Sequence, residues 1–150
     1  MKKNQYFRLS SSESVFVREP LTRLKNLIFT FKVQYHFIRA FRKMHFIGPC
    51  VTIFGSARFG PETDHYKNAE KIGTAMANLG FTVMTGGGPG IMEAANKGAK
   101  RGKGNSVGLN INLPFEQKPN DFIDRDKSID FNYFFVRKTV FLKYSQGFIG

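Results

Sequence analysis

The sequence predicts an α/β fold, a Rossmann-like parallel sheet flanked by helices, with an N-terminal helical extension. Two observations predict it. From residue 49 onward, short apolar runs alternate with segments of helical periodicity, and strand–helix–strand repeats of this length form parallel sheets with right-handed crossovers. Two of the apolar runs lead into loops of small residues, which is typical of the carboxyl edge of such a sheet. The length of 150 residues suits one domain with a sizeable core.

Residues 1–48 form a basic N-terminal extension in two parts. Residues 1–20 are polar, and we expect a mobile end there. Residues 21–46 predict one amphipathic helix, with Thr22 as a candidate N-cap and Gly48-Pro49 as a stop signal. Its apolar residues recur at steps of three and four: Leu24, Leu27, Ile28, Phe31, Tyr35 and Ile38.

Cations interrupt every apolar run of this helix, which excludes a transmembrane span of about 20 residues. A compact apolar region of the kind that signal peptides contain is also missing. Two interpretations stay open. We favour packing of the helix against the domain or a second subunit, and the alternative is a helix lying on a membrane surface. The interrupting cations are Lys25, Lys32, Arg39, Arg42 and Lys43.

Residues 49–150 predict the Rossmann-like domain, in which continuous apolar runs indicate strands covered on both faces. Gly80 closes the first helix of the domain. The expected elements are strands over residues 50–54, 81–84 and 106–111, helices over 63–79 and 90–100, and the beginning of a further strand over 147–150.

The loop Gly86–Gly90 holds three consecutive glycines, Pro89 and a fourth glycine. The free N–H groups and positive dipole end of the helix that follows suit an anion, above all a phosphate. Glycines let the backbone turn and let a ligand approach closely. The alternative is a plain strand-to-helix turn, for which one glycine suffices. The loop Gly55–Arg58 belongs to the same edge, and we expect the two loops to converge on one site.

Two common nucleotide motifs do not fit. The first strand is not followed by G-x-G-x-x-G, and no G-x-x-x-x-G-K-[ST] occurs. The site therefore suits a mononucleotide or sugar phosphate, and not NAD or ATP.

Composition narrows the class further. A single cysteine, Cys50, excludes a disulfide framework and a cysteine metal cluster, and three scattered histidines make no zinc site. We expect no metal, no cofactor and a cytoplasmic location. The net charge is +12, but residues 1–48 hold ten Lys or Arg against two Glu, a balance of +8, and no nucleic-acid motif accompanies them. We therefore expect no specific nucleic-acid partner, with an acidic partner surface or nonspecific polyanion binding as the alternative.

Three motifs in this order resemble those of the LOG ("Lonely Guy") family, many members of which carry the older label "lysine decarboxylase-like". They are Phe54–Arg58, Gly86–Ala99 and Phe134–Lys138, and the resemblance covers about residues 49–150. It implies a homodimeric hydrolase that cleaves the N-glycosidic bond of a purine nucleoside 5′-monophosphate, with its site near the subunit interface. AMP or a cytokinin riboside monophosphate would give free base and ribose 5-phosphate.

The resemblance also implies the site residues. Arg137 and Lys138 are a substrate-binding pair in which Arg137 is important for catalysis; otherwise Arg137 is an exposed arginine at a helix start. Glu93 contacts ribose hydroxyls or is simply a first-turn acid that favours the helix dipole. The complete substrate-binding set is Gly55, Ser56, Gly86, Gly87, Gly88, Gly90, Met92, Glu93, Arg137 and Lys138.

The sequence departs from the family pattern at its end. The motif P-G-G-x-G-T-x-x-E, whose glutamate assists the reaction, is expected just after Gly150. We therefore expect a C-terminally truncated piece of a protein longer by about 70–100 residues. Without that motif, hydrolysis by the 150 residues alone is in doubt, and a non-catalytic nucleotide-binding module is the alternative. Literal lysine decarboxylation requires a pyridoxal phosphate pocket, which nothing in the sequence resembles.

Overall fold

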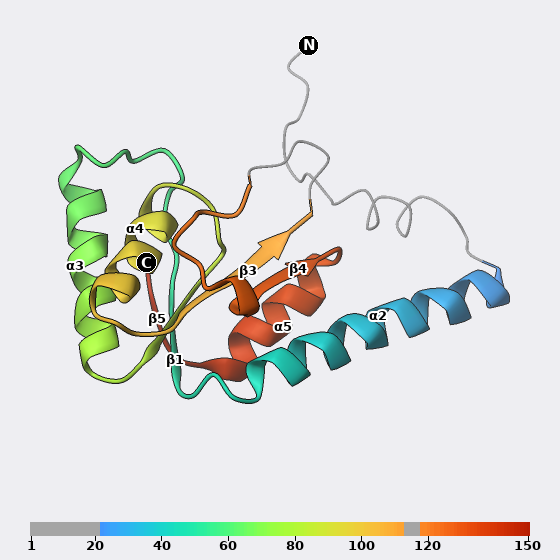
Figure 1. Ribbon diagram of the computed structural model, residues 1–150. Helices are drawn as coiled ribbons and strands as arrows, with labels where there is room; N and C mark the ends of the chain where they lie inside the picture. The colour runs from blue at the N-terminus through green and yellow to red at the C-terminus, as the bar shows by residue number, and fades with distance from the viewer. Residues whose placement is uncertain (1–21, 113–117) are drawn as a thin grey trace, which may run out of the picture.

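The computed structural model describes residues 22–112 and 118–150, in which five parallel strands form one sheet (Figure 1). The strand order is β4-β3-β2-β1-β5, and each neighbouring pair is parallel. This confirms the predicted α/β class. The strands are β1 (Cys50–Ile53), β2 (Thr82–Thr85), β3 (Ser106–Ile111), β4 (Ser128–Phe131) and β5 (Ser145–Ile149).

Helices cover both faces of the sheet (Figure 1). On one face lie α3 (Asp64–Asn78) and α4 (Ile91–Arg101); on the other lie α2 (Arg23–Met44) and α5 (Phe134–Tyr144). A short 3-10 turn, η1 (Arg125–Lys127), precedes β4. The predicted elements of the domain match the observed ones to within one or two residues.

Large side chains fill the core between the sheet and the helices α2 and α5. Met84, Leu109 and Phe131 from three different strands are fully buried there, together with Val140 of α5. Cys50, the first residue of β1, is fully buried in the same core, and burial raises the pKa of its thiol to about 11. The apolar residues of this side therefore stabilise the fold mainly by area removed from water.

On the opposite face, α3 and α4 pack by close backbone approach. A Cβ atom at Gly73 would lie 2.3 Å from the Ala95 carbonyl oxygen, and one at Gly98 would lie 2.1 Å from the Glu70 carbonyl oxygen. Only glycine fits at these two positions. The two helices therefore hold each other, and the loops at their ends, at a fixed short separation.

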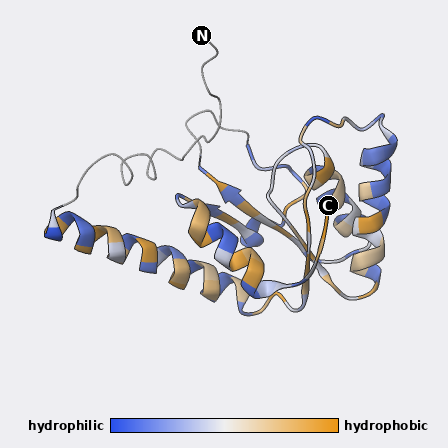
Figure 2. Cartoon of the chain, turned by 180° about the vertical axis from the view of Figure 1, so that it is seen from behind, coloured by the Kyte–Doolittle hydropathy of each residue, from blue (hydrophilic) through white to orange (hydrophobic). Residues whose placement is uncertain are grey.

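Helix α2 is present and packs against the domain, but the apolar residues that recur at steps of three and four lie on its exposed side. Its packed side consists of different residues, among them the buried His36, Ala40 and Met44. Because α2 carries apolar residues on two sides, periodicity alone does not say which side faces the domain. Figure 2 shows hydrophobic and hydrophilic residues alternating along this helix. Leu24, Leu27, Ile28, Phe31, Tyr35 and Ile38, which define the expected side, are all exposed.

The ends of α2 also differ slightly from expectation. Thr22 is the N-cap residue, but its hydroxyl makes no capping hydrogen bond, and the helix ends at Met44 instead of Phe46. The expected mobile end over residues 1–20 lies outside the described residues. None of the helices that the structure describes is long and apolar enough to cross a membrane.

The strand order reverses at β1. The chain moves outward from β1 through β2 and β3 to β4, and α5 then returns it to the other side of β1, where β5 pairs. In open parallel sheets, ligands bind beyond the carboxyl ends of the strands at such a reversal. The loops after β1 and β2 both lie at that edge.

Candidate functional site

The loop Gly86–Gly90 joins β2 to α4 in a conformation that needs glycine at two positions. Gly87 has φ +77° and Gly90 has φ +72°, values that other residues rarely adopt. A Cβ at Gly87 would lie 1.8 Å from Asn110 Oδ1, and one at Gly90 would lie 2.4 Å from the Ser56 carbonyl oxygen. At these two positions, the absence of a side chain therefore makes room for other atoms of the protein.

A network of buried amide side chains hydrogen-bonds this loop from the interior of the protein. Thr85 Oγ1 donates to Asn96 Oδ1 at 2.6 Å and accepts from the Gly87 N–H at 3.0 Å. Asn120 Nδ2 donates to the carbonyl oxygens of Gly87 and Gly88, at 3.2 and 3.1 Å, and to Asn96 Oδ1 at 3.0 Å. The loop carbonyls are thereby fixed toward the protein interior.

Several backbone donors remain at the start of α4. Within residues 22–112 and 118–150, the N–H groups of Gly88, Met92 and Glu93 have no hydrogen-bond partner. Free donors of this kind, at the positive end of a helix dipole, attract an anion. The Ile91 N–H is not among them, because it donates to the Ser56 carbonyl oxygen at 3.1 Å.

The loop after β1 lies directly against this helix start. Besides the bond from Ile91, the Ser56 hydroxyl accepts a hydrogen bond from the Arg58 N–H at 3.2 Å. A Cβ at Gly55 would lie 2.3 Å from Ile91 Cγ2, so the backbone of this loop touches the first residue of α4. The two glycine-containing loops are therefore neighbours in space.

Arg137, in the first turn of α5, reaches across the ends of β2 and β3. Its Nε donates to the Leu109 carbonyl oxygen at 2.7 Å and its Nη2 to the Gly86 carbonyl oxygen at 3.1 Å. Its guanidinium lies 5.4 Å from the centroid of the Phe141 ring. No carboxylate in the described part of the chain forms an ion pair with it.

Burial of Arg137 lowers the pKa of its guanidinium to about 10, which leaves it charged at neutral pH. A desolvated cation with only neutral acceptors around it is costly unless an anion compensates it. Nη1 makes no hydrogen bond to any described residue and is the donor that remains for such an anion.

The other expected residues divide between two sides of α4. Met92 lies on the Arg137 side, since a Cβ at Gly86 would lie 3.0 Å from its sulfur and 2.6 Å from Arg137 Nη2. Glu93 turns toward α3 instead, where its Oε1 accepts a hydrogen bond from the Tyr66 hydroxyl at 2.8 Å. Lys138 is exposed beside Arg137 on α5.

A hollow of about 340 Å³ opens between the carboxyl ends of β1 and β5 and the helix α3. Phe54, Ser56 and Ile91 line it together with Phe59 and His65. The Phe54 ring also packs edge-on against Phe141, at 5.1 Å between centroids. The Arg137 guanidinium lies over the same Phe141 ring. Phe54 therefore links the hollow to the arginine.

Comparison with known proteins assigns the chain to a family. The SLOG cluster4 family matches residues 49–132, more than half of the chain. The chain belongs to the SLOG cluster4 family. The resemblance to LOG proteins is thus confirmed at the level of a LOG/SLOG-like protein, in a nucleotide-related α/β family. None of the curated proteins matches the chain.

Two solved structures with TM-scores above 0.5 support the fold, and a third, more distant one is also similar to part of the chain. TM1055, a structural genomics target, is 22% identical over 67% of this chain and 58% of its own, with a TM-score of 0.54. The molybdenum cofactor binding protein from the phototrophic bacterium Rippkaea orientalis is 27% identical over 68% of this chain and 63% of its own, with a TM-score of 0.53. The molybdenum cofactor carrier protein from Chlamydomonas reinhardtii is 26% identical, covering 55% and 48%, with a TM-score of 0.43. The chain thus spans less than two thirds of the length of these structures.

The sequence analysis did not single out the amides that hold the SLOG glycine loop. Asn96 is fully buried, and its Nδ2 donates to Ser106 Oγ at 2.8 Å. The signal was present, because Asn96 stands in a helix whose neighbours Ala94, Ala95 and Ala99 are all buried. A polar residue on an apolar helix side requires buried partners. Asn120 carried no such signal, since its surroundings in the sequence are polar.

Proposed function

We propose that the chain binds a nucleoside 5′-monophosphate at the carboxyl edge of its sheet, with the phosphate or a sugar oxygen at Arg137. The observation that carries the proposal is the buried guanidinium, 3.1 Å from the carbonyl of the glycine loop and without an acid partner among residues 22–112 and 118–150. The backbone N–H groups at the start of α4 that lack a partner among the described residues are further hydrogen-bond donors for the phosphate, next to the carboxyl end of β2. The site residues are those that the sequence analysis named, with Gly86, Met92 and Arg137 at its centre.

The reaction we propose is hydrolysis of the N-glycosidic bond. Water attacks the anomeric carbon while the bond to the purine breaks, through an oxocarbenium-like state that a nearby carboxylate stabilises. Glu93 is held by Tyr66 on the α3 side, so we assign it to the ribose side and not to the Arg137 side. The carboxylate for the reaction is the glutamate of the P-G-G-x-G-T-x-x-E motif, which residues 1–150 do not contain.

The test begins with binding by the chain itself. Calorimetry with AMP compares the native chain with Arg137→Met and Arg137→Lys, and with Lys71→Met on the exposed side of α3 as the control. Loss of a charge-assisted hydrogen bond costs about 2 kcal/mol, so we expect roughly thirtyfold weaker binding in Arg137→Met. Equal affinity in Arg137→Met and the native chain would remove Arg137 from the site.

Release of free adenine distinguishes hydrolysis from binding. Chromatography of AMP incubated with the chain, and with the protein extended beyond Gly150, should show adenine and ribose 5-phosphate with the extended protein. Binding without release by both proteins supports the second candidate, a binding module for a nucleotide or for the molybdenum cofactor. The Rippkaea orientalis protein, which binds that cofactor, is the relative that favours the second candidate.

A homodimer with the site near the subunit interface is part of the same proposal. Light scattering of the protein measures its mass directly. A monomer at micromolar concentration would separate the site from any interface and remove this part of the proposal.

A further inference from the structure

Helix α2 has an apolar side that nothing in the described structure covers. Five residues at successive steps of four, three, four and three form it, and we call them the outer stripe. Between 47% and 66% of each side chain is exposed. On a helix with 3.6 residues per turn they share one side, opposite the buried His36, Ala40 and Met44. The outer stripe consists of Leu24, Ile28, Phe31, Tyr35 and Ile38.

The charge around this stripe has one sign. Helix α2 carries six Lys or Arg and no Asp or Glu. Lys25, Lys32 and Arg39 follow one another at steps of seven and so form a row along one flank of the outer stripe. An apolar side bordered by cations alone is the composition of helices that lie in the interface of an anionic membrane.

Self-association through the stripe is less compatible with the same charges. If two outer stripes met in antiparallel fashion, the cationic rows of the two copies would lie against each other. Arg42, four residues after Ile38, continues the line of the stripe and would enter that contact. On a membrane the same side chain extends to the headgroups while its stem stays in apolar surroundings.

The placement of α2 leaves the stripe accessible to a flat surface. The helix runs along the margin of the molecule, and its N-terminal half extends past the sheet (Figures 1 and 2). Its 22 residues span about 33 Å. Since the packed side faces the domain, the outer stripe is exposed along the helix, and part of it lines a hollow at the edge of the domain.

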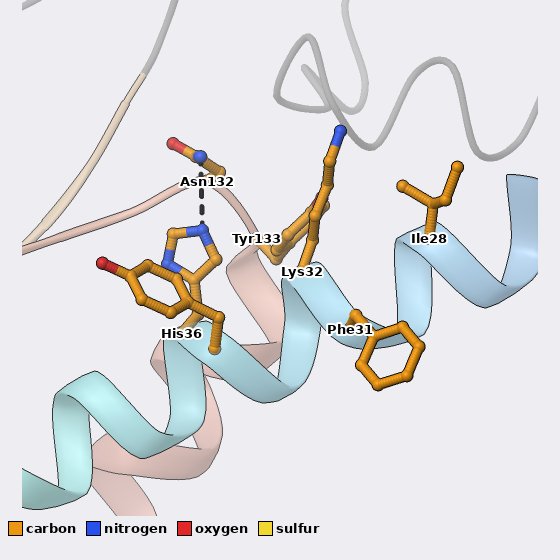
Figure 3. A pocket seen from close by; sticks show the side chains of 7 residues that line it. Ile28, Phe31, Lys32, His36, Asn132 and Tyr133 are labelled. Atoms are coloured by element: carbon orange, nitrogen blue, oxygen red, sulfur yellow. Dashed lines mark hydrogen bonds between the residues drawn. The ribbon is translucent and has the colours of Figure 1, made fainter.

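A hollow of about 560 Å³ borders the stripe (Figure 3). Ile28 and Phe31 line it on the stripe side, and Lys32 lies beside Tyr133. Asn132 and His36 point toward one another at 3.3 Å between their side-chain nitrogens. The hollow thus places a cation and polar groups next to apolar side chains, a combination that complements an anionic headgroup and the upper part of its acyl chain.

We propose that α2 docks the protein on an anionic lipid surface through the outer stripe and its cationic row. The whole 150-residue chain is mixed with phosphatidylcholine vesicles that contain or lack phosphatidylserine, and bound protein is measured by co-sedimentation. We expect binding only to the vesicles with phosphatidylserine, and its loss at an ionic strength of about 1 M, where the Debye length is about 3 Å. Equal binding to both vesicle types, or to neither, would overturn the proposal.

Two double variants of α2, each compared with a double variant elsewhere on the surface, separate the role of the outer stripe from general surface effects. Phe31→Ser with Ile38→Ser should abolish binding, whereas Leu79→Ser with Leu142→Ser should not, although these leucines, at the C-cap of α3 and on α5, are at least as exposed. Lys25→Glu with Lys32→Glu should weaken binding by at least about 25-fold, at about fivefold for each cation lost, and the added carboxylates increase the loss. Lys67→Glu with Lys71→Glu on α3 makes the same change of net charge and should have a much smaller effect.

The residues tested are exposed, so circular dichroism should show an unchanged fold in every variant. If the control pairs lose binding as strongly as the α2 pairs, the surface charge as a whole and not α2 is responsible. If the chain instead forms a dimer that Phe31→Ser with Ile38→Ser dissociates, and binds no lipid, the outer stripe is a self-association surface and the proposal is wrong.

Discussion

The two faces of the sheet are packed against their helices in different ways. Between the sheet and α2 and α5, large side chains such as Met44 and Phe131 fill the space. Between α3 and α4, the contact rests on Gly73 and Gly98, where one carbon atom more would strike backbone oxygen. The first face, which we call the bulky face, is stabilised by the apolar area that it buries. The second, which we call the precise face, holds its two helices at a fixed separation. The loop Gly86–Gly90 begins α4 and so depends on the precise face, whereas Arg137 approaches it from the bulky one.

The largest expected effect is at the α3–α4 contact. Gly98→Ala places a methyl group 2.1 Å from the Glu70 carbonyl oxygen and 2.9 Å from the Thr74 nitrogen, both of which are backbone atoms. We expect a loss of about 3 kcal/mol in the free energy of unfolding, measured by denaturant titration. Gly147→Ala is the matched control, because nothing lies within 4 Å of its Cβ position. Similar losses in both variants would show that the contact is not restrictive.

The next effect concerns the amides below the glycine loop. Asn96→Ala removes the side-chain partner of the Ser106 hydroxyl, and one of the partners of the Thr85 hydroxyl and of the Asn120 amide. We expect a loss of about 2 kcal/mol of stability. Asn68→Ala on the exposed side of α3 should change stability by less than about 0.5 kcal/mol. If the two variants unfold at the same denaturant concentration, the network does not hold the loop.

The bulky face should tolerate a change of shape. Met44→Leu conserves volume in a core of flexible and aromatic side chains, and we expect a cost below about 1.5 kcal/mol in the same titration. A cost as large as that of Gly98→Ala would mean that both faces are packed to the same tolerance, and the contrast between them would fail.

The smallest effect is a dependence on pH that arises from the bulky face. Burial, with the nearby Arg39, lowers the pKa of His36 below its usual value of about 6.5. The unfolded chain therefore binds a proton before the folded one does. This contribution to stability is complete above pH of about 6.5 and is lost as the pH falls toward the lowered pKa. Unfolding of His36→Gln should show a smaller slope over this window, whereas exposed His65→Gln should keep the native slope.

Sequence periodicity predicted the precise face better than the bulky one. The helices α3 and α4 and the strands β1 to β3 follow apolar patterns with clear glycine boundaries, and all were expected within one or two residues. The strand β4 was not expected, because its four residues include Asp130 and show no continuous apolar run. For α2, the helical period was correct, but with apolar residues on two sides the period could not show which side faces the domain.

The candidate site shows the same limit at the level of single residues. The convergence of the loops after β1 and β2 followed from the rule that ligand loops share the carboxyl edge. That Glu93 turns to Tyr66 and that Gly87 faces Asn110 depends on contacts between residues far apart in the chain. No local pattern contains such contacts, so the sequence could suggest space for a ligand or a plain turn, but not the contacts that the glycines make within the protein.

Cys50 allows the stability of the core to be compared between variants of the two faces of the sheet. Its thiol is fully buried and its pKa is raised to about 11, so a thiol reagent has neither access nor a reactive thiolate in the folded state. Labelling then requires the opening of the first strand of the sheet. Since Cys50 is the single cysteine, the rate of its modification in native buffer reports how often the core opens. Each variant of either face can be ranked in this way without any added probe.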